Sequence, residues 1–194
     1  MTSRFFAALI ASTLLVVSGC LDVDSKLAAN GSGTMTISYT VDPRALSTER
    51  AKLEGPNVKV TNAEYKGNRG VFALNFDDAT KLNTSKALEN VTVSIADGEG
   101  GTKAVTAKIV NPKPQKLNDD VVGKVGKEVH ISVEFPGDIV TSNATSTAGA
   151  VAKWVFATPD FTNRPEVILQ ATYKNPAAAG GAAAAPAGKP AGTP

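Results

Sequence analysis

The sequence has little of the chemistry that disulfide frameworks, metal centres and nucleic-acid interfaces require. Its 194 residues include one cysteine and one histidine, which excludes an internal disulfide and the usual zinc and haem ligand sets. Lys plus Arg number 20 and Asp plus Glu number 18, so the net charge is only +2, and no basic run of the kind that binds nucleic acid is present. Aromatic residues make up 6% of the chain, whereas 42% of it is hydrophobic. This composition predicts one globular domain with a real core.

The N-terminal segment, residues 1–19, has the organisation of a bacterial lipoprotein signal peptide. Arg4 supplies a positive charge, and residues 5–17 form an uncharged stretch that is too short to span a bilayer. The lipobox that follows consists of Val17, Ser18, Gly19 and Cys20. Small residues before the cysteine give a signal peptidase access to the bond, and the thiol is the site of diacylglyceryl attachment. We therefore predict that Cys20 carries lipid, with palmitate-like chains that together hold the protein stably on a membrane.

This interpretation predicts three segments: the signal peptide 1–19, a domain over 20–174 anchored through Cys20, and a tail over 175–194. In the tail, 17 of 20 residues are Ala, Gly or Pro, a composition that cannot bury enough apolar area to fold. The expected location is the non-cytoplasmic side of a bacterial membrane. The alternative is a soluble secreted protein whose sole cysteine lies at the cleavage site by chance, and we favour the anchored protein.

Between the two ends, apolar residues alternate with polar ones, which predicts strands. Three hairpins are expected, over 21–27 with 35–41, 58–65 with 71–76, and 91–95 with 105–109. Two short helices are expected over 44–53 and 78–89, because Asp42-Pro43 and Asp78 are typical of helix starts, and a break of the second near Asn83 is the alternative. The order predicts an α+β fold, with a mainly antiparallel sheet from successive hairpins and two short helices on one face.

The C-terminal part of the domain is harder to assign from its pattern. Residues 111–126 are expected to be an irregular connection, because Asn111-Pro112-Lys113-Pro114 breaks the alternation. Three more strands are expected, over 129–135, 151–157 and 167–173. They either extend the main sheet or form a separate subdomain, and the pattern does not decide between the two.

Few residues are candidates for catalysis or metal binding. His130 shares a strand face with Glu128, Ser132 and Glu134, so His130 and Glu134 are a possible acid–base pair. The polar side of a half-buried strand explains the same pattern, and we favour it. The acidic pairs Asp77-Asp78 and Asp119-Asp120 lack the ligand spacing of a calcium loop and are interpreted as helix capping and surface solvation. We therefore predict a non-enzymatic protein with no catalytic residue, no metal and no cofactor.

The segment His130–Val140, with Asn143 and Trp154 after it, resembles the LppM-domain lipoproteins of bacteria. The motif residues are Phe135, Pro136, Gly137, Asn143 and Trp154. The resemblance implies an α+β envelope domain with a role in binding lipid-like amphiphiles, and it carries over no catalytic residue. Two departures are an Ala144 in place of the glycine that follows the asparagine in the family, and the Ala/Pro tail in place of a C-terminal membrane helix.

The motif also has a physical interpretation of its own. Pro136-Gly137 suits the middle of a type II turn, which would end one strand sharply and redirect the chain. A structural role for Pro136, Gly137 and Trp154 is therefore favoured over direct contact with a ligand.

Two functional hypotheses follow. The first is a membrane-anchored module that binds a lipid-like amphiphile or envelope glycolipid, and it predicts an apolar pocket near the Cys20 end. The second is a structural or adaptor lipoprotein that binds another envelope protein, and it predicts a packed interior with a contiguous exposed apolar patch. We favour the first.

Overall fold

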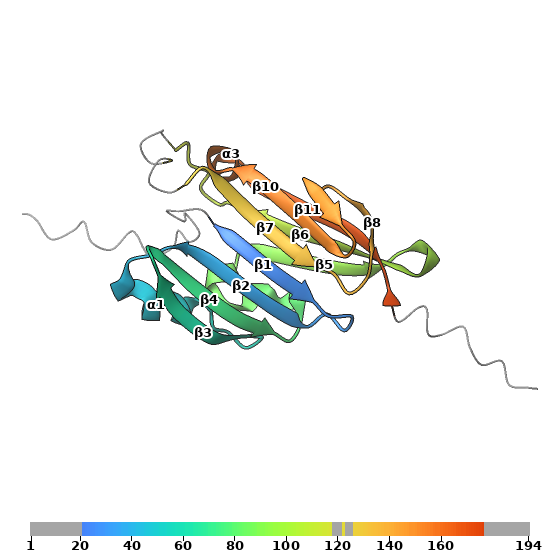
Figure 1. The fold of residues 1–194 in the computed structure, drawn as a ribbon, viewed down its shortest axis with the longest axis horizontal. Coiled ribbons are helices and arrows are strands. Elements are labelled where there is room, and N and C mark those ends of the chain that lie inside the picture. The colour runs from blue at the N-terminus through green and yellow to red at the C-terminus, as the bar shows by residue number, and fades with distance from the viewer. Residues whose placement is uncertain (1–20, 118–121, 123–125, 177–194) are drawn as a thin grey trace, which may run out of the picture.

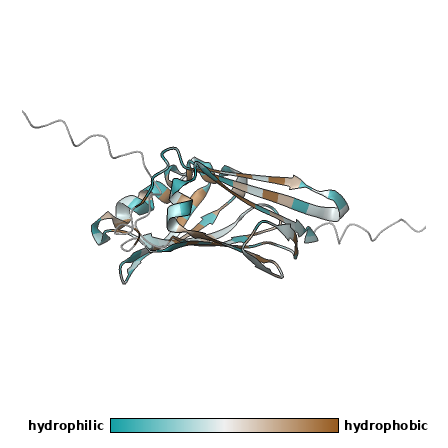
Figure 2. Ribbon diagram, turned by 90° about the horizontal axis from the view of Figure 1, so that it is seen from above, coloured by the Kyte–Doolittle hydropathy of each residue, from teal (hydrophilic) through white to brown (hydrophobic). Residues whose placement is uncertain are grey.

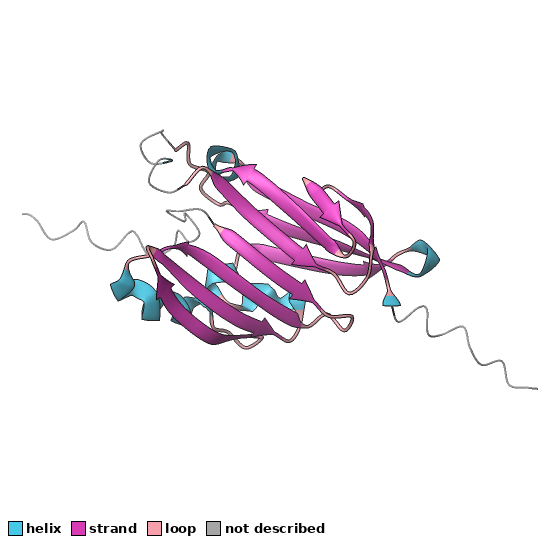
Figure 3. Cartoon of the chain, in the orientation of Figure 1, coloured by secondary structure: helices cyan, strands magenta, loops and turns pink. Residues whose placement is uncertain are grey.

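The computed structural model describes residues 21–117, 122 and 126–176. The lipobox with Cys20, the signal peptide, and the chain from residue 177 onwards lie outside the described residues. Within them, the predicted α+β class is confirmed, with strands predominating and only short helices between them (Figure 3).

The larger of two sheets contains seven strands in the order β3-β4-β2-β1-β7-β10-β9 (Figure 1). Their bounds are β1 Asp22–Leu27, β2 Gly33–Thr40, β3 Val58–Lys66, β4 Arg69–Phe76, β7 Glu128–Glu134, β9 Ser146–Ala148 and β10 Val151–Ala157. All neighbours are antiparallel except β1 and β7, which pair in parallel with Val23 opposite Ile131. The first two predicted hairpins therefore form β1–β2 and β3–β4 of this sheet.

The smaller sheet contains four antiparallel strands in the order β5-β6-β11-β8. Their bounds are β5 Val91–Asp97, β6 Thr102–Val110, β8 Ile139–Ser142 and β11 Glu166–Lys174. The third predicted hairpin, β5–β6, thus lies in this second sheet and not beside the first two hairpins. The C-terminal strands do not stay together either, because β7, β9 and β10 extend the larger sheet while β8 and β11 join the smaller one. The short strands β8 and β9 had no clear signal in the sequence.

The helical segments are short. Their bounds are η1 Pro43–Ala45, α1 Leu46–Leu53, η2 Ala79–Thr84, η3 Lys86–Leu88, η4 Glu99–Gly101 and α3 Thr158–Asn163. Asp42 and Asp78 accept hydrogen bonds from the first turns that follow them, as expected for helix starts. The helical stretch expected over 78–89 is interrupted, as the alternative with a break near Asn83 predicted, but it consists of two 3₁₀ segments with an extended Ser85 between them and contains no α-helix. The Ser85 hydroxyl is fully buried and donates to the Lys52 carbonyl at 3.0 Å, which holds the chain there out of helical geometry.

The two sheets form separate layers, and the helices α1, η2 and η3 lie on the same side of the larger sheet as the smaller sheet (Figure 2). Helix α1 packs on β3, and η2 packs on β5. The inner face of the larger sheet is therefore covered in two parts, by helices over β3 and β4 and by the smaller sheet over β1, β7 and β10. The core contains buried side chains from both parts, among them Phe72, Leu74 and Trp154.

The turn after β7 differs from the type II turn that Pro136-Gly137 predicts. The φ angle of Gly137 lies outside the left-handed region that such a turn requires at its third position. The glycine is required for a different reason: a Cβ at this position would lie 2.0 Å from the carbonyl oxygen of Lys174. The predicted turn type is therefore wrong, and Gly137 instead allows the chain between the two sheets to pass close to the end of β11.

Tyr39 on β2 joins the larger sheet to helix α1. Its ring stacks on Phe72 with centroids 5.3 Å apart, and its hydroxyl donates to Oε2 of Glu49 at 3.1 Å. The other oxygen of Glu49 accepts from Nζ of Lys52 at 2.7 Å, and both of these side chains are largely buried. Burial raises the pKa of Tyr39 far above its usual value, and the neighbouring carboxylate of Glu49 raises it further.

This raised pKa predicts a loss of stability at high pH. Above about pH 10 the unfolded chain loses the Tyr39 proton while the folded chain keeps it, so the free energy of unfolding falls by up to ~1.4 kcal/mol per pH unit. Tyr39→Phe should remove this contribution to the fall of the unfolding free energy with pH. The free energy is measured by urea unfolding at several pH values between neutral pH and pH 11. Tyr65→Phe, at an exposed ring on β3, is the matched control and should keep the wild-type slope. An unchanged slope in Tyr39→Phe would contradict the assignment.

Candidate functional site

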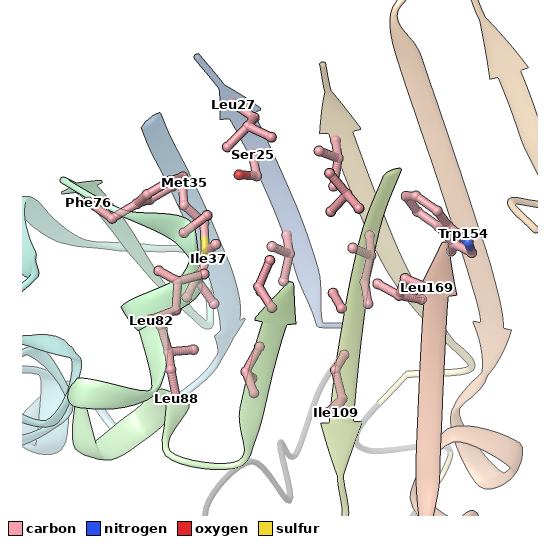
Figure 4. Close-up of a pocket in the computed structure, with 18 of the residues that line it drawn as sticks. Ser25, Leu27, Met35, Ile37, Phe76, Leu82, Leu88, Ile109, Trp154 and Leu169 are labelled. Atoms are coloured by element: carbon pink, nitrogen blue, oxygen red, sulfur yellow. The ribbon is translucent and has the colours of Figure 1, made fainter. Parts of the chain in front are cut away.

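An apolar cavity of about 160 Å³ lies between the two sheets. Its walls are the inward-facing side chains of β1, β2, β7 and β10 on one side and of β5, β6 and β11 on the other (Figure 4). Side chains of η2 and η3, among them Leu82 and Leu88, complete the wall where helices replace the smaller sheet. Leu21, the residue after the predicted lipid attachment site, is also part of the lining.

The alternation in the sequence explains why this space is apolar. On β5 and β6, Val91, Val93, Val105 and Ile109 face inward, while their neighbours in the chain face solvent. The space exists because several inward positions carry small side chains. Ala107 on β6 lies between Val93 of β5 and Leu169 of β11 in the register, and the next inward residue along β11 is Ala171. Sheet-on-sheet packing with such short side chains leaves part of the layer between the sheets unfilled.

Only two of the lining residues, Ser25 and Trp154, carry polar side-chain atoms, and none carries a charge. The indole N–H of Trp154 donates to Oδ1 of Asn143 at 2.8 Å, so its hydrogen-bonding capacity is already used. A site of this kind binds hydrocarbon by removing its surface from water, at roughly 25 cal/mol per Å². No Cys, His, Lys, Asp or Glu accompanies the Ser25 hydroxyl among the lining residues.

Asn143, just after β8, connects the two sheets beside the cavity. Its Oδ1 accepts from Trp154 of the larger sheet and also from the backbone N–H of Gln170 in the smaller sheet, both at 2.8 Å. Its Nδ2 donates to the Ile168 carbonyl at 2.9 Å, and its own N–H donates to the Gln170 carbonyl at 3.1 Å. One side chain therefore fixes the spacing between β10 and β11.

The other motif residues also lie where the two sheets meet. Phe135 lines the cavity and stacks on Tyr173 of β11, with ring centroids 5.3 Å apart. Burial raises the pKa of Tyr173. Gly137 lies against the end of β11, as described above. Asn143 and Trp154 of the motif are thus joined to each other, whereas Phe135 lies farther along, four residues beyond Ile131, the register partner of Trp154. The sequence analysis did not identify Ser25 or Ala107 as lining residues, although a serine at an inward position of β1 was a signal that it overlooked.

His130 lies on the opposite, outer face of the larger sheet. Its Nε2 is 3.2 Å from a carboxylate oxygen of Glu128 on the same strand, while Glu134 contacts Lys26 at 2.7 Å. The proposed pairing of His130 with Glu134 therefore does not form. A shallow depression on this face brings His130 near Asp22 and Asp24, two further carboxylates that the sequence pattern did not place beside it.

The groups of this outer depression lie on an open surface, and one of its carboxylates is already paired. Asp22 forms an ion pair with Arg69, and the His130 side chain is 46% exposed on an open sheet surface. Over the described part of the chain, no three His, Cys, Asp or Glu side chains are arranged to hold a metal ion.

Of the two acidic pairs noted in the sequence, only Asp77-Asp78 lies within the described residues. Asp78 caps η2, and hydrogen bonds from the Thr80 hydroxyl and backbone hold the pKa of its carboxyl below the usual value. Asp119 and Asp120 lie outside the described residues.

Of the exposed large apolar side chains in the described ranges, three lie on the neighbouring strands β6, β11 and β8 of the smaller sheet. The exposed large hydrophobic residues each lie on a different strand, in both sheets: Tyr65, Val110, Val140, Val155 and Ile168. No helix among the described residues has the length and apolar character needed to cross a membrane.

The fold is similar to that of a known structure. The folded domain of the LppM protein of Mycobacterium tuberculosis, determined by NMR, superimposes with a TM-score of 0.53 and 16% sequence identity. The similarity covers 83% of this chain and 93% of the LppM domain. The chain therefore has the LppM fold, in agreement with the resemblance seen in its sequence. No protein-family model and no curated protein sequence matches this chain.

Removing the Asn143 side chain should destabilise the junction between the sheets. Asn143→Ala leaves the buried Trp154 N–H without its acceptor, and we expect a loss of about 1–3 kcal/mol in the free energy of unfolding. Asn75→Ala, on the exposed side of β4, is the matched control and should change stability by less than about 0.5 kcal/mol. In a double-mutant cycle with Trp154→Phe, the two losses should be non-additive by about 1 kcal/mol. Strict additivity would show that the two side chains do not stabilise each other.

Proposed function

We propose that this protein is a bacterial envelope lipoprotein that binds, without catalysing a reaction, the apolar part of a lipid-like amphiphile or envelope glycolipid. The binding site is the cavity between the two sheets, and the membrane is contacted through lipid on Cys20. The observation that carries the proposal is the cavity itself, because an unfilled, almost wholly apolar space is costly in a domain of this size. A bound hydrocarbon chain would offset that cost.

Three further features support the proposal. The cavity lining extends to Leu21, so the proposed binding site begins at the residue next to the proposed anchor. The domain shares its fold with the LppM domain. The open outer surface around His130 offers no enclosed site for a reaction. The adaptor hypothesis has less support, because it predicted a packed interior, whereas a cavity lies between the two sheets.

Filling the cavity should abolish ligand binding without unfolding the protein. Ala107→Leu places a larger side chain in the centre of the cavity, and we expect at least a tenfold loss of affinity for delipidated protein titrated with extracted envelope lipids. Because the substitution fills empty space, the free energy of unfolding should stay the same or rise by about 1 kcal/mol. Thr106→Leu, one residue away on the outer face of β6, is the matched control and should bind as the wild type does. If the wild-type protein binds none of the extracted lipids saturably, the proposal fails.

The anchor is tested independently of the cavity. Cys20→Ser should abolish metabolic labelling with fatty acid and leave the protein with its signal peptide uncleaved, because the thiol is the acceptor of the lipid that precedes cleavage. Ser18→Ala keeps a small residue in the lipobox and should be labelled and processed normally. A wild-type protein that carries no label, together with a Cys20→Ser variant of unchanged size that still sediments with membranes, would overturn the proposed anchoring.

A further inference from the structure

Ser25 is the one residue that breaks the apolar inner face of β1. Its neighbours along the strand on that face are Val23 and Leu27, and its partners across the sheet are Met35 of β2 and Val133 of β7. A hydroxyl group therefore lies at the centre of four apolar side chains, at a position where alternation predicts a fifth. Figure 4 shows its oxygen among the side chains that line the cavity.

The Ser25 hydroxyl is only partly satisfied by the protein. It donates to the Thr34 carbonyl at 3.2 Å, which is longer than the usual range for a hydroxyl donor. A hydroxyl group has one donor and two acceptor sites, so both acceptor sites of Ser25 remain available to a ligand. Trp154 is the other lining residue with a polar group, and Asn143 already occupies it. A polar atom of a ligand in this cavity therefore has one side chain to bind, and it is Ser25.

The lining also limits the charge of that ligand atom. None of the lining residues is Lys, Arg, His, Asp or Glu. Transferring a carboxylate or phosphate from water into such surroundings without a counter-ion is strongly unfavourable, whereas an uncharged hydroxyl needs only a hydrogen bond, which it can donate to an open acceptor site of Ser25. A ligand group that binds the Ser25 hydroxyl in this lining is therefore expected to be polar and uncharged.

The size of the cavity limits the number of hydrocarbon chains. At about 160 Å³ it is close to an engineered protein cavity of about 150 Å³ that holds one benzene molecule. By that comparison the cavity holds about six carbon atoms of one acyl chain, whereas segments of two chains side by side would require the sheets to separate at the junction made by Asn143 and Trp154.

We propose that the cavity selects single-chain amphiphiles whose uncharged polar group hydrogen-bonds to the Ser25 hydroxyl. This inference rests on the proposed function and specifies the class of ligand for the same site. Free fatty acids, as carboxylates, and two-chain phospholipids are excluded by the absence of a counter-ion and by the narrow space.

The test compares decanol, decanoate and decane, which share one chain and differ in the group at its end. With the wild-type protein at neutral pH, decanol should bind at least tenfold more tightly than decanoate. In Ser25→Ala the affinity for decanol should fall about fivefold, the equivalent of one hydrogen bond, while the affinity for decane is unchanged. Ser25→Thr, which keeps the hydroxyl, should retain the preference for decanol. Ser94→Ala, at an exposed serine of β5, is the matched control and should bind all three as the wild type does.

Monodecanoylglycerol and didecanoylglycerol test the number of chains, and the single-chain compound should bind at least tenfold more tightly. The inference is overturned if decanoate binds as tightly as decanol, if Ser25→Ala leaves decanol binding unchanged, or if the two-chain glyceride binds equally well. In each of these cases, binding that Ala107→Leu abolishes would leave the proposed function intact. If the wild-type protein binds none of the probes, both proposals fail.

Discussion

The hydrogen bonds of the Asn143 side chain hold together a domain that is otherwise two sheets with a partly empty layer between them. Apolar contact across that layer is incomplete, because the cavity removes the partners of many inward-facing side chains. The spacing of the sheets therefore depends on their junction, where Asn143 binds Trp154 in one sheet and Gln170 in the other. Phe135 and Gly137 also join the two sheets, the first by stacking on Tyr173 and the second by allowing the backbones to approach.

This arrangement separates the rigid part of the molecule from the part that would accept a ligand. The helices fill the space under β3 and β4 with fully buried side chains such as Leu53 and Phe72. The inward residues of β6 are only half-buried, as are Val23 and Ser25 of β1, because they face the cavity, whereas Leu27 at the end of β1 is buried. The larger sheet thus has one half covered tightly by helices and one half covered loosely by a second sheet. An apolar chain placed in the second half would complete the core instead of competing with it.

The LppM domain has the same fold at 16% identity, so the fold tolerates extensive change in sequence. In this chain the alternation of apolar and polar positions maintains the strand register, because a shift of one residue would turn every inward side chain to solvent. Within that constraint, single inward positions are free to vary in size and polarity. In this chain Ser25 and Ala107 are such positions, and they determine the polarity and the volume of the cavity.

Local pattern alone was sufficient for the strands of the three hairpins, for the helix starts at Asp42 and Asp78, and for the lipobox prediction at Cys20, which lies outside the described residues. Each of these depends on residues that are close together in the chain. Alternation shows which face of a strand is buried, but it does not show which other strand will cover that face. The parallel pairing of β1 with β7 joins Lys26 to Glu134, 108 residues away, and the division of the hairpins between two sheets follows from such distant contacts. The cavity, the junction at Asn143 and the inward position of Ser25 were therefore decided only by the tertiary structure, because each depends on the space left between elements that no local pattern relates.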